Sequence, residues 1–345
     1  MGIIGRHSFE LCSRPRIISS ASYVGDKEGK GPLRECFDKI CRDDTLGLDS
    51  WEQAESRMFE SAVRVALAKI KRQSDDLSCL LGGDLLNQII SSGFAAREIR
   101  APFIGLYGAC STISEGLMLG GMLVDGGFAE LAACAASSHF SAAERQFRYP
   151  LEMGVQAVPS SQRTVTGAGS IIIQAAGEFR PGEGNVFEHV ALTGGTIGSV
   201  EDFGITDANN MGAAMAPAAF KTIKTHLSDY SRRVEDYDRI ITGDLGIFGS
   251  DMLYELLRGE GIEIADRHED CGKLMFSPEQ NVNCGASGCG CAATVMSSWF
   301  LPKIESGEIR RVLFLATGAL MSPVSSLQGE SIPSIAHAVV IEHID

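Results

Sequence analysis

The feature that most constrains the fold of this chain is an internal repeat, because one order of predicted elements occurs twice within 345 residues. In each half an apolar strand leads to a turn of small residues, the turn opens a helix, and another apolar strand follows a glycine-containing turn. The two small-residue turns are Gly108–Cys110 and Cys284–Gly290. The repeat predicts a fold built from two equivalent halves.

Hydrophobic periodicity places the elements of both halves. The first half is predicted to contain strands and helices at Arg16–Val24, Trp51–Lys71, Leu77–Leu81, Pro102–Tyr107, Gly108–Val124, Phe128–Ala136 and Gly169–Ala176. The second half repeats this order at Val186–Thr193, Met211–Leu227, Asp238–Thr242, Asp251–Arg258, Cys284–Ile304, Arg311–Ala316 and Ala336–Glu342. Linker residues gather at Arg180–Gly184, so we expect an N-terminal half over residues 1–180 and a C-terminal half over 181–345.

The predicted strands are apolar throughout, which is typical of sheets covered by helices on both faces, and we expect them to be mostly parallel. Two such sheets enclosing the paired small-residue helices give an α/β fold with five layers, α/β/α/β/α. A single doubly wound sheet is the alternative. It does not account for the duplicated turn and helix units.

Charge and cysteine content limit the functional classes. A net charge of −14 argues against nucleic-acid binding, which needs clustered Lys and Arg. The ten cysteines occur in a long chain whose first residues lack an apolar leader, so we expect reduced thiols that mostly fill the core of an intracellular protein. The most apolar region, Ala101–Ser138, is interrupted by Glu115, Asp125 and Glu130, so we expect a soluble chain.

Cys110 stands between a buried strand and the start of a helix. Unpaired backbone N–H groups and the positive end of the helix dipole stabilise a thiolate at such a position, which makes the cysteine nucleophilic. The other interpretation is a buried cysteine that fills a tight turn. Position alone favours the second interpretation.

Three motifs, in this order and spacing, resemble the thiolase and ketoacyl-synthase superfamily over essentially the whole chain. They are Gly108–Ser111, which resembles the acylated-cysteine turn, Thr166–Ser170, a glycine-rich turn before a strand, and Asn281–Ala286, which leads to a catalytic histidine in thiolases. The resemblance implies the five-layer fold and a homodimer paired through the edge strand Pro102–Tyr107.

The chain departs from that superfamily at its catalytic positions. Gly288-Cys289-Gly290-Cys291 occupies the place of the thiolase histidine, Thr242–Gly246 contains neither the expected histidine nor asparagine, and Ala316–Ala319 lacks the late cysteine. Claisen condensation needs a base and an oxyanion hole beside the thiolate. We therefore expect a binding pocket with no catalytic residues, and the alternative is an acyl-CoA or acyl-carrier-protein acyltransferase that uses Cys110.

Within the superfamily, the chain resembles a sporulation-protein family of endospore-forming bacteria. The motifs concerned are Gly108–Thr112, Ser137–Phe140, Glu144–Arg148, Thr164–Gly169, Thr242–Gly246 and Cys289–Cys291. This resemblance implies non-enzymatic binding of dipicolinic acid (pyridine-2,6-dicarboxylate), with or without calcium. It also implies assembly with other subunits of a spore membrane channel complex, peripheral to the spore inner membrane, that takes up this ligand in sporulation and releases it in germination.

The candidate ligand-binding residues lie in the motifs that carry this resemblance, and a dianion needs both a positive field and a flat slot. These candidate residues are Cys110, Ser111, His139, Arg145, Arg148, Asp244, Cys289 and Cys291. We expect N–H donors from the turn at Cys110, charge from the two arginines, and room for the ring at Gly288–Cys291. Cys110 is then a neutral thiol, because a thiolate repels the ligand.

Each candidate also has a structural interpretation. The arginines can belong to a solvated loop, His139 can be a satisfied structural residue, and an Asp in a glycine-rich turn such as Asp244 commonly caps or forms the turn. The cysteines 271, 284, 289 and 291 lack Cys-x-x-Cys pairs, so we expect neither a metal site nor a cofactor.

Overall fold

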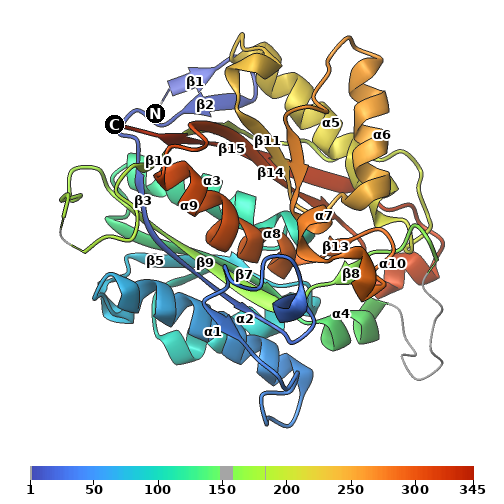
Figure 1. The fold of residues 1–345 in the computed structure, drawn as a ribbon, viewed down its shortest axis with the longest axis horizontal. Helices are drawn as coiled ribbons and strands as arrows, with labels where there is room; N and C mark the ends of the chain where they lie inside the picture. The colour runs from blue at the N-terminus through green and yellow to red at the C-terminus, as the bar shows by residue number, and fades with distance from the viewer. Residues whose placement is uncertain (1, 148–157, 183) are drawn as a thin grey trace.

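A computed structural model describes residues 2–147, 158–182 and 184–345 (Figure 1). Its main strands form one hydrogen-bonded path of ten, which we divide between β3 and β10 into two five-stranded sheets. The first sheet has the order β6 (Phe103–Gly105), β5 (Cys79–Gly83), β7 (Leu131–Ser138), β9 (Gly167–Gln174) and β3 (Arg16–Val24). The second has the order β12 (His268–Asp270), β11 (Arg239–Thr242), β14 (Arg311–Ala319), β15 (Ser334–His343) and β10 (Val190–Thr196). A single residue pair, Arg16 with Ala191, joins the sheets between β3 and β10.

Strand directions are identical in the two sheets, and they correct the expectation of mostly parallel pairing. In the first sheet β5 is parallel to β6 and β7, whereas β9 is antiparallel to β7 and β3. In the second, β11 is parallel to β12 and β14, whereas β15 is antiparallel to β14 and β10. Strands buried on both faces read as continuous apolar runs whatever their direction, so the sequence could not distinguish the antiparallel pairs.

Helices complete five layers, as the sequence predicts (Figure 1). Helices α1 (Trp51–Lys69) and α2 (Ile90–Ile99) cover the outer face of the first sheet, and α5 (Met211–Asp229) covers that of the second with α6 (Gly246–Arg258) packed on it. The middle layer contains α3 (Thr112–Asp125), α8 (Cys289–Val295) and α9 (Leu301–Glu305). Helix α3 packs against β7 of one sheet and β15 of the other, so both sheets share the central core.

Small residues let the middle helices approach the sheets closely. A Cβ atom on Gly169 of β9 would lie 2.4 Å from the carbonyl carbon of Ala293 in α8, and one on Gly120 of α3 would lie 2.8 Å from Cys134 Sγ in β7. Close packing at these two interfaces therefore depends on glycine in α3 and β9 and on the small residues of α8. A larger side chain at either position would push a helix off its sheet.

The remaining elements modify the duplicated plan. They are β1 (Gly2–Ile4), β2 (Ser8–Glu10), β4 (Lys39–Ile40), α4 (Phe140–Phe147), β8 (Arg163–Thr164), α7 (Cys271–Met275), β13 (Ala286–Ser287) and α10 (Pro323–Leu327). Strand β2 pairs with β10, so the N-terminal hairpin is attached to the second sheet. The proposed boundary at residues 180 and 181 falls in the connection between β9 and β10.

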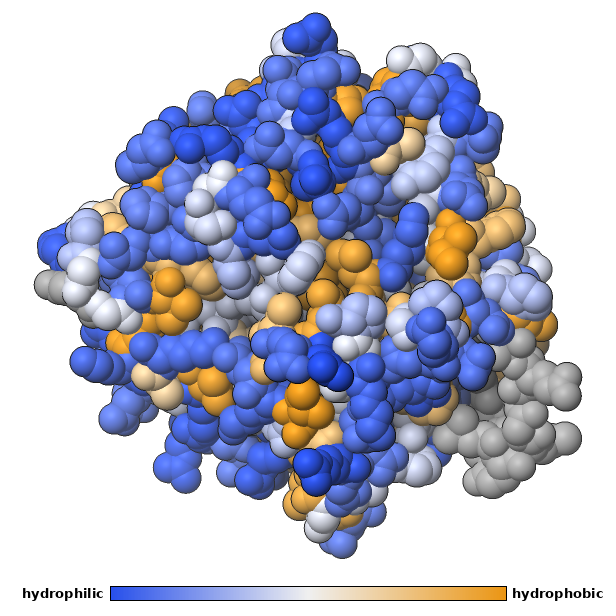
Figure 2. Space-filling view, in the orientation of Figure 1, coloured by the Kyte–Doolittle hydropathy of each residue, from blue (hydrophilic) through white to orange (hydrophobic). Residues whose placement is uncertain are grey.

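The expectation from composition was of reduced cysteines that are mostly buried, in a chain without a long apolar segment. All ten cysteines are free thiols, and all except Cys12 and Cys36 are buried. Within the described part of the chain, no helix combines the length and the apolar character needed to cross a bilayer. Figure 2 shows a largely hydrophilic face on which hydrophobic side chains form small, separate patches.

Candidate functional site

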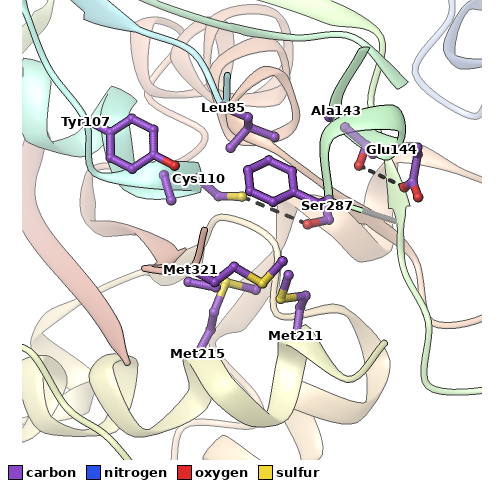
Figure 3. Close-up of a pocket in the computed structure, with 13 residues that line it drawn as sticks. Leu85, Tyr107, Cys110, Ala143, Glu144, Met211, Met215, Ser287 and Met321 are labelled. Carbon is purple, nitrogen blue, oxygen red and sulfur yellow. Dashed lines mark hydrogen bonds between the residues drawn. The ribbon is translucent and has the colours of Figure 1, made fainter. Parts of the chain in front are cut away.

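A cavity opens beside Cys110, between the turn that precedes α3, helix α4 and the start of α5 (Figure 3). Its empty volume is about 530 Å³, including the mouth. The described lining is mainly apolar and contains the aromatic and thioether side chains of Tyr107, Phe147, Met211, Met215 and Met321. We call this space, which Cys110 and Ser287 also line, the inner cavity.

Cys110 lies in the single helical turn Ala109–Ser111, immediately before α3, and its side chain is buried. Its Sγ atom lies 4.0 Å from Ser287 Oγ (Figure 3). Burial raises the pKa of Cys110 well above its ordinary value, and the carboxyl group of Asp244 raises it further. The Gly288 amide acts in the opposite direction, but burial outweighs it. Cys110 is therefore a neutral thiol at neutral pH.

Asp244 is a fully buried carboxyl group between β11 and α6. Its Oδ2 accepts hydrogen bonds from the Gly288 amide at 2.9 Å and Ser287 Oγ at 3.0 Å, and its Oδ1 accepts one from Thr317 Oγ1 at 3.1 Å. Burial raises the pKa of Asp244 to about 7 despite these donors. Asp244 thus connects three segments around Cys110 and neither caps a helix nor reaches open solvent.

Cys289 and Cys291 begin α8, and both thiols are directed at backbone carbonyl groups. Cys289 Sγ donates to Ala109 O at 2.9 Å, and Cys291 Sγ lies 3.6 Å from Gly243 O. Burial raises the pKa of both thiols well above the ordinary value. Among the described residues, no group of three or more His, Cys, Asp or Glu side chains is placed to hold a metal ion.

The glycines of this turn do not provide space for a ligand, which corrects the sequence-based expectation. A Cβ atom on Gly290 would lie 2.4 Å from the carbonyl oxygen of Gly167, and one on Gly288, whose φ is +101°, would lie 2.8 Å from Ser138 Oγ. The missing side chains are replaced by neighbouring backbone and by Ser138. The glycines are required for packing between the two halves.

A second correction concerns the backbone N–H groups after Cys110, which were expected to bind the ligand. The Ser111 amide donates to Gly108 O at 3.0 Å, and the Thr112 amide donates to Ala109 O. Ser111 Oγ also donates to Gly108 O, at 2.6 Å. Because the Ser111 and Thr112 amides are satisfied within the turn, these two groups are not presented to a ligand as an anion site requires. The expectation for the Cys110 amide is unchanged by these bonds.

The structure also places the residues that were expected to supply positive charge differently from the prediction. Arg145 forms an ion pair with Glu52 and packs 5.3 Å from the Trp51 ring centre, and it is not among the described residues that line the inner cavity. His139 is fully buried, its Nε2 lies 2.7 Å from Asp44 O, and burial lowers its pKa. Arg148 lies outside the described residues.

A second, polar cavity, which no sequence motif indicated, adjoins the inner one. It has an empty volume of about 700 Å³ and is lined by Lys27, Phe140, Glu144, Arg163 and Asn281 among others. We call it the outer cavity. Glu144 lines both cavities, and Thr164 Oγ1 donates to its Oε1 at 3.2 Å.

Sequence comparison identifies the family to which this site belongs. The profile of the family described as "Stage V sporulation protein AD (SpoVAD)" matches residues 5–342. The "Stage V sporulation protein AD" of Bacillus subtilis (strain 168) is 43% identical over 343 residues, which are 99% of this chain and 98% of that protein. The chain belongs to the stage V sporulation protein AD family. Family membership confirms the resemblance to a sporulation-protein family.

Solved structures similar to this stage V sporulation protein AD family member show the wider fold. The cerulenin-bound OleA of Xanthomonas campestris has a TM-score of 0.58 at 14% identity, over 98% of this chain and 98% of that chain. The 3-oxoacyl-[acyl-carrier-protein] synthase III of Aquifex aeolicus VF5 has a TM-score of 0.55 at 12% identity, over 95% of this chain and 100% of that chain. At such identities the similarity confirms the thiolase-like fold alone.

Proposed function

We propose that this chain binds dipicolinic acid without chemical turnover, as a subunit of the spore membrane channel complex that takes up this ligand in sporulation and releases it in germination. In this role it is peripheral to the spore inner membrane. The observation that carries the proposal is the environment of Cys110. The superfamily position for a nucleophile is occupied by a buried neutral thiol, which lies beside a carboxyl group that is partly protonated at neutral pH.

The inner cavity supports binding in preference to catalysis. Its described lining contains neither a histidine nor an asparagine to act as a base or to stabilise an oxyanion. Its aromatic and thioether side chains suit one face of a flat ring. Cys110 is neutral and Asp244 is partly protonated, so Glu144 is the acidic side chain of the described lining that a dianion would meet.

Calorimetric titration of the purified chain tests this function. We expect saturable binding of dipicolinate and no binding of acetyl-CoA at equal concentrations, with the dipicolinate titration repeated in the presence of calcium. We also expect no condensation or thiolysis with acetyl-CoA, malonyl-CoA or acetoacetyl-CoA. Absence of dipicolinate binding with and without calcium contradicts the proposal.

A second candidate is acyl transfer through Cys110, and one observation favours it. Cys110 lines the inner cavity, and Asp244, whose pKa is about 7, lies beside it where a base would be needed. Intact-protein mass spectrometry after incubation with acyl-CoA distinguishes the candidates. An acyl adduct that is absent from Cys110→Ala would establish the enzyme and contradict binding without chemistry.

A further inference from the structure

The outer cavity adjoins the inner one through Glu144, which lines both, and β8 lies between them. Side chains of successive strand residues point to opposite faces. Thr164 lines the inner cavity, whereas Arg163 lines the outer cavity. Helix α4 contributes Glu144 to both spaces and Phe140 to the outer one. The outer cavity therefore has a more polar lining than the inner one, with which it shares Glu144.

Arg163 is positioned like a recognition residue that lacks its acceptor. Its guanidinium group lies 3.6 Å from the centre of the Phe140 ring, a cation–π contact that fixes the plane of the group. Its Nε atom is buried without a hydrogen-bond partner among the described residues, and within that part of the chain the guanidinium group forms no ion pair. The charges of Glu28 and Glu144 act on this guanidinium group from nearby, and a bound carboxylate would add a charge-assisted hydrogen-bond acceptor for its terminal nitrogens.

Lys27 brings a second positive charge to the same space. Burial lowers the pKa of Lys27, and the nearby charge of Arg163 lowers it further. Glu28 is too buried to cancel this field, because burial raises its pKa to about 7 and leaves it partly protonated at neutral pH. In the described lining of the outer cavity, two cationic side chains face a single acidic one, Glu144. Lys27, Phe140 and Arg163 also border a neighbouring pocket, whose lining includes Arg42 and the acidic residues Asp26, Glu28, Asp43 and Asp44.

We propose that the outer cavity is a carboxylate-binding site for a planar aromatic anion, with Arg163 and Lys27 as its recognition residues. Arg163 binds a carboxylate through its terminal nitrogens, and Lys27 binds the same group or a second one. Assignment of dipicolinate as the natural ligand rests on the function proposed above. The site itself rests on the geometry of Arg163, Phe140 and Lys27.

Calorimetry on the full chain tests the site with three probes: dipicolinate, its monocarboxylate analogue picolinate, and inorganic phosphate. We expect the order of affinity dipicolinate, picolinate, phosphate, since only the first two present a ring and only the first presents two carboxylates. Arg163→Gln should weaken dipicolinate binding about tenfold or more, and Lys27→Gln should weaken it by about threefold or more.

Arg145→Gln is the matched control, because Arg145 is an exposed arginine of α4 already paired with Glu52. Its affinity for dipicolinate should stay within about twofold of the unmodified chain. Because Lys27 is the more exposed of the two cations, Lys27→Gln tests the site even where Arg163→Gln fails to fold. Phosphate binding as tight as dipicolinate binding, lost equally in both variants, would overturn the assignment to a planar carboxylate.

The outcomes separate this inference from the proposed function. Dipicolinate binding that is unchanged in both Arg163→Gln and Lys27→Gln contradicts the outer site and leaves the function intact. Absence of dipicolinate binding contradicts the function, and the site is then tested with benzoate and phthalate. Binding of either that depends on Arg163 supports the site, and absence of both contradicts it.

Discussion

Replacing Asp244 with asparagine tests the electrostatic state of the site. The carboxyl group is fully buried and has a folded pKa of about 7, against its ordinary value of 3.8. Between these values the folded chain binds a proton that the unfolded chain has released, so the native state loses stability as pH rises. The Asp244→Asn variant escapes this loss, because a side-chain amide stays neutral over the whole range.

The magnitude follows from the two pKa values. Each pH unit between them is worth about 1.4 kcal/mol, which gives about 4 kcal/mol in full and about 2.5 kcal/mol between pH 5 and pH 8. An asparagine can retain the bonds from Ser287 and Gly288 through its oxygen and donate to Thr317 through its nitrogen. We therefore expect Asp244→Asn to gain stability over the unmodified chain by about that amount as pH rises from 5 to 8.

Urea unfolding of both proteins at several pH values measures this difference. Titration of Glu28, whose pKa is also about 7, occurs in both proteins and cancels from the comparison. Asp229→Asn is the control, because hydrogen bonds from His7, Ser8 and Arg6 lower the pKa of Asp229 below its ordinary value against the effect of burial. Its effect should be constant over the same range. A pH-independent difference for Asp244→Asn would refute a raised pKa.

Two further predictions concern assembly and the thiol. We expect a homodimer paired through the edge strand β6, whose Ile104 is 42% exposed. Light scattering should give twice the chain mass of 36.8 kDa, and the Ile104→Lys variant should give the mass of a single chain. A single-chain mass for the unmodified protein would contradict the dimer. Cys110→Ser should keep dipicolinate affinity within about threefold by calorimetry, because a hydroxyl replaces a neutral thiol, whereas loss beyond about tenfold would make the sulfur essential.

Most of the fold could be predicted, because apolar runs and small-residue turns make the repeat visible in the sequence. Helix α2 was not predicted, because its buried face contains Ser91, Ser92, Ala95 and Ala96, which carry little apolar signal. Strand β12 was also missed. It has the sequence His-Glu-Asp at positions 268–270, and its pairing with β11 identifies it as a strand.

The site could be predicted only in part, because its chemistry depends on partners far apart in the sequence. Cys110 was found from its place between a strand and a helix. Arg145 was expected to supply charge to the site, but it pairs with Glu52 and is not among the described residues that line the inner cavity. The sequence could not show this ion pair, because the two residues are 93 positions apart. Arg163 was missed for a similar reason: only the fold brings it over Phe140 and beside Lys27.

The central claim, that the chain binds dipicolinate without chemical turnover, is tested most directly by equilibrium dialysis of the full chain against dipicolinate. The ligand is then recovered and the intact mass of the protein is measured. The account predicts saturable retention of dipicolinate, chemically unchanged on recovery, with no mass added to the protein. Absence of retention, consumption of the ligand or a covalent adduct on Cys110 would contradict it.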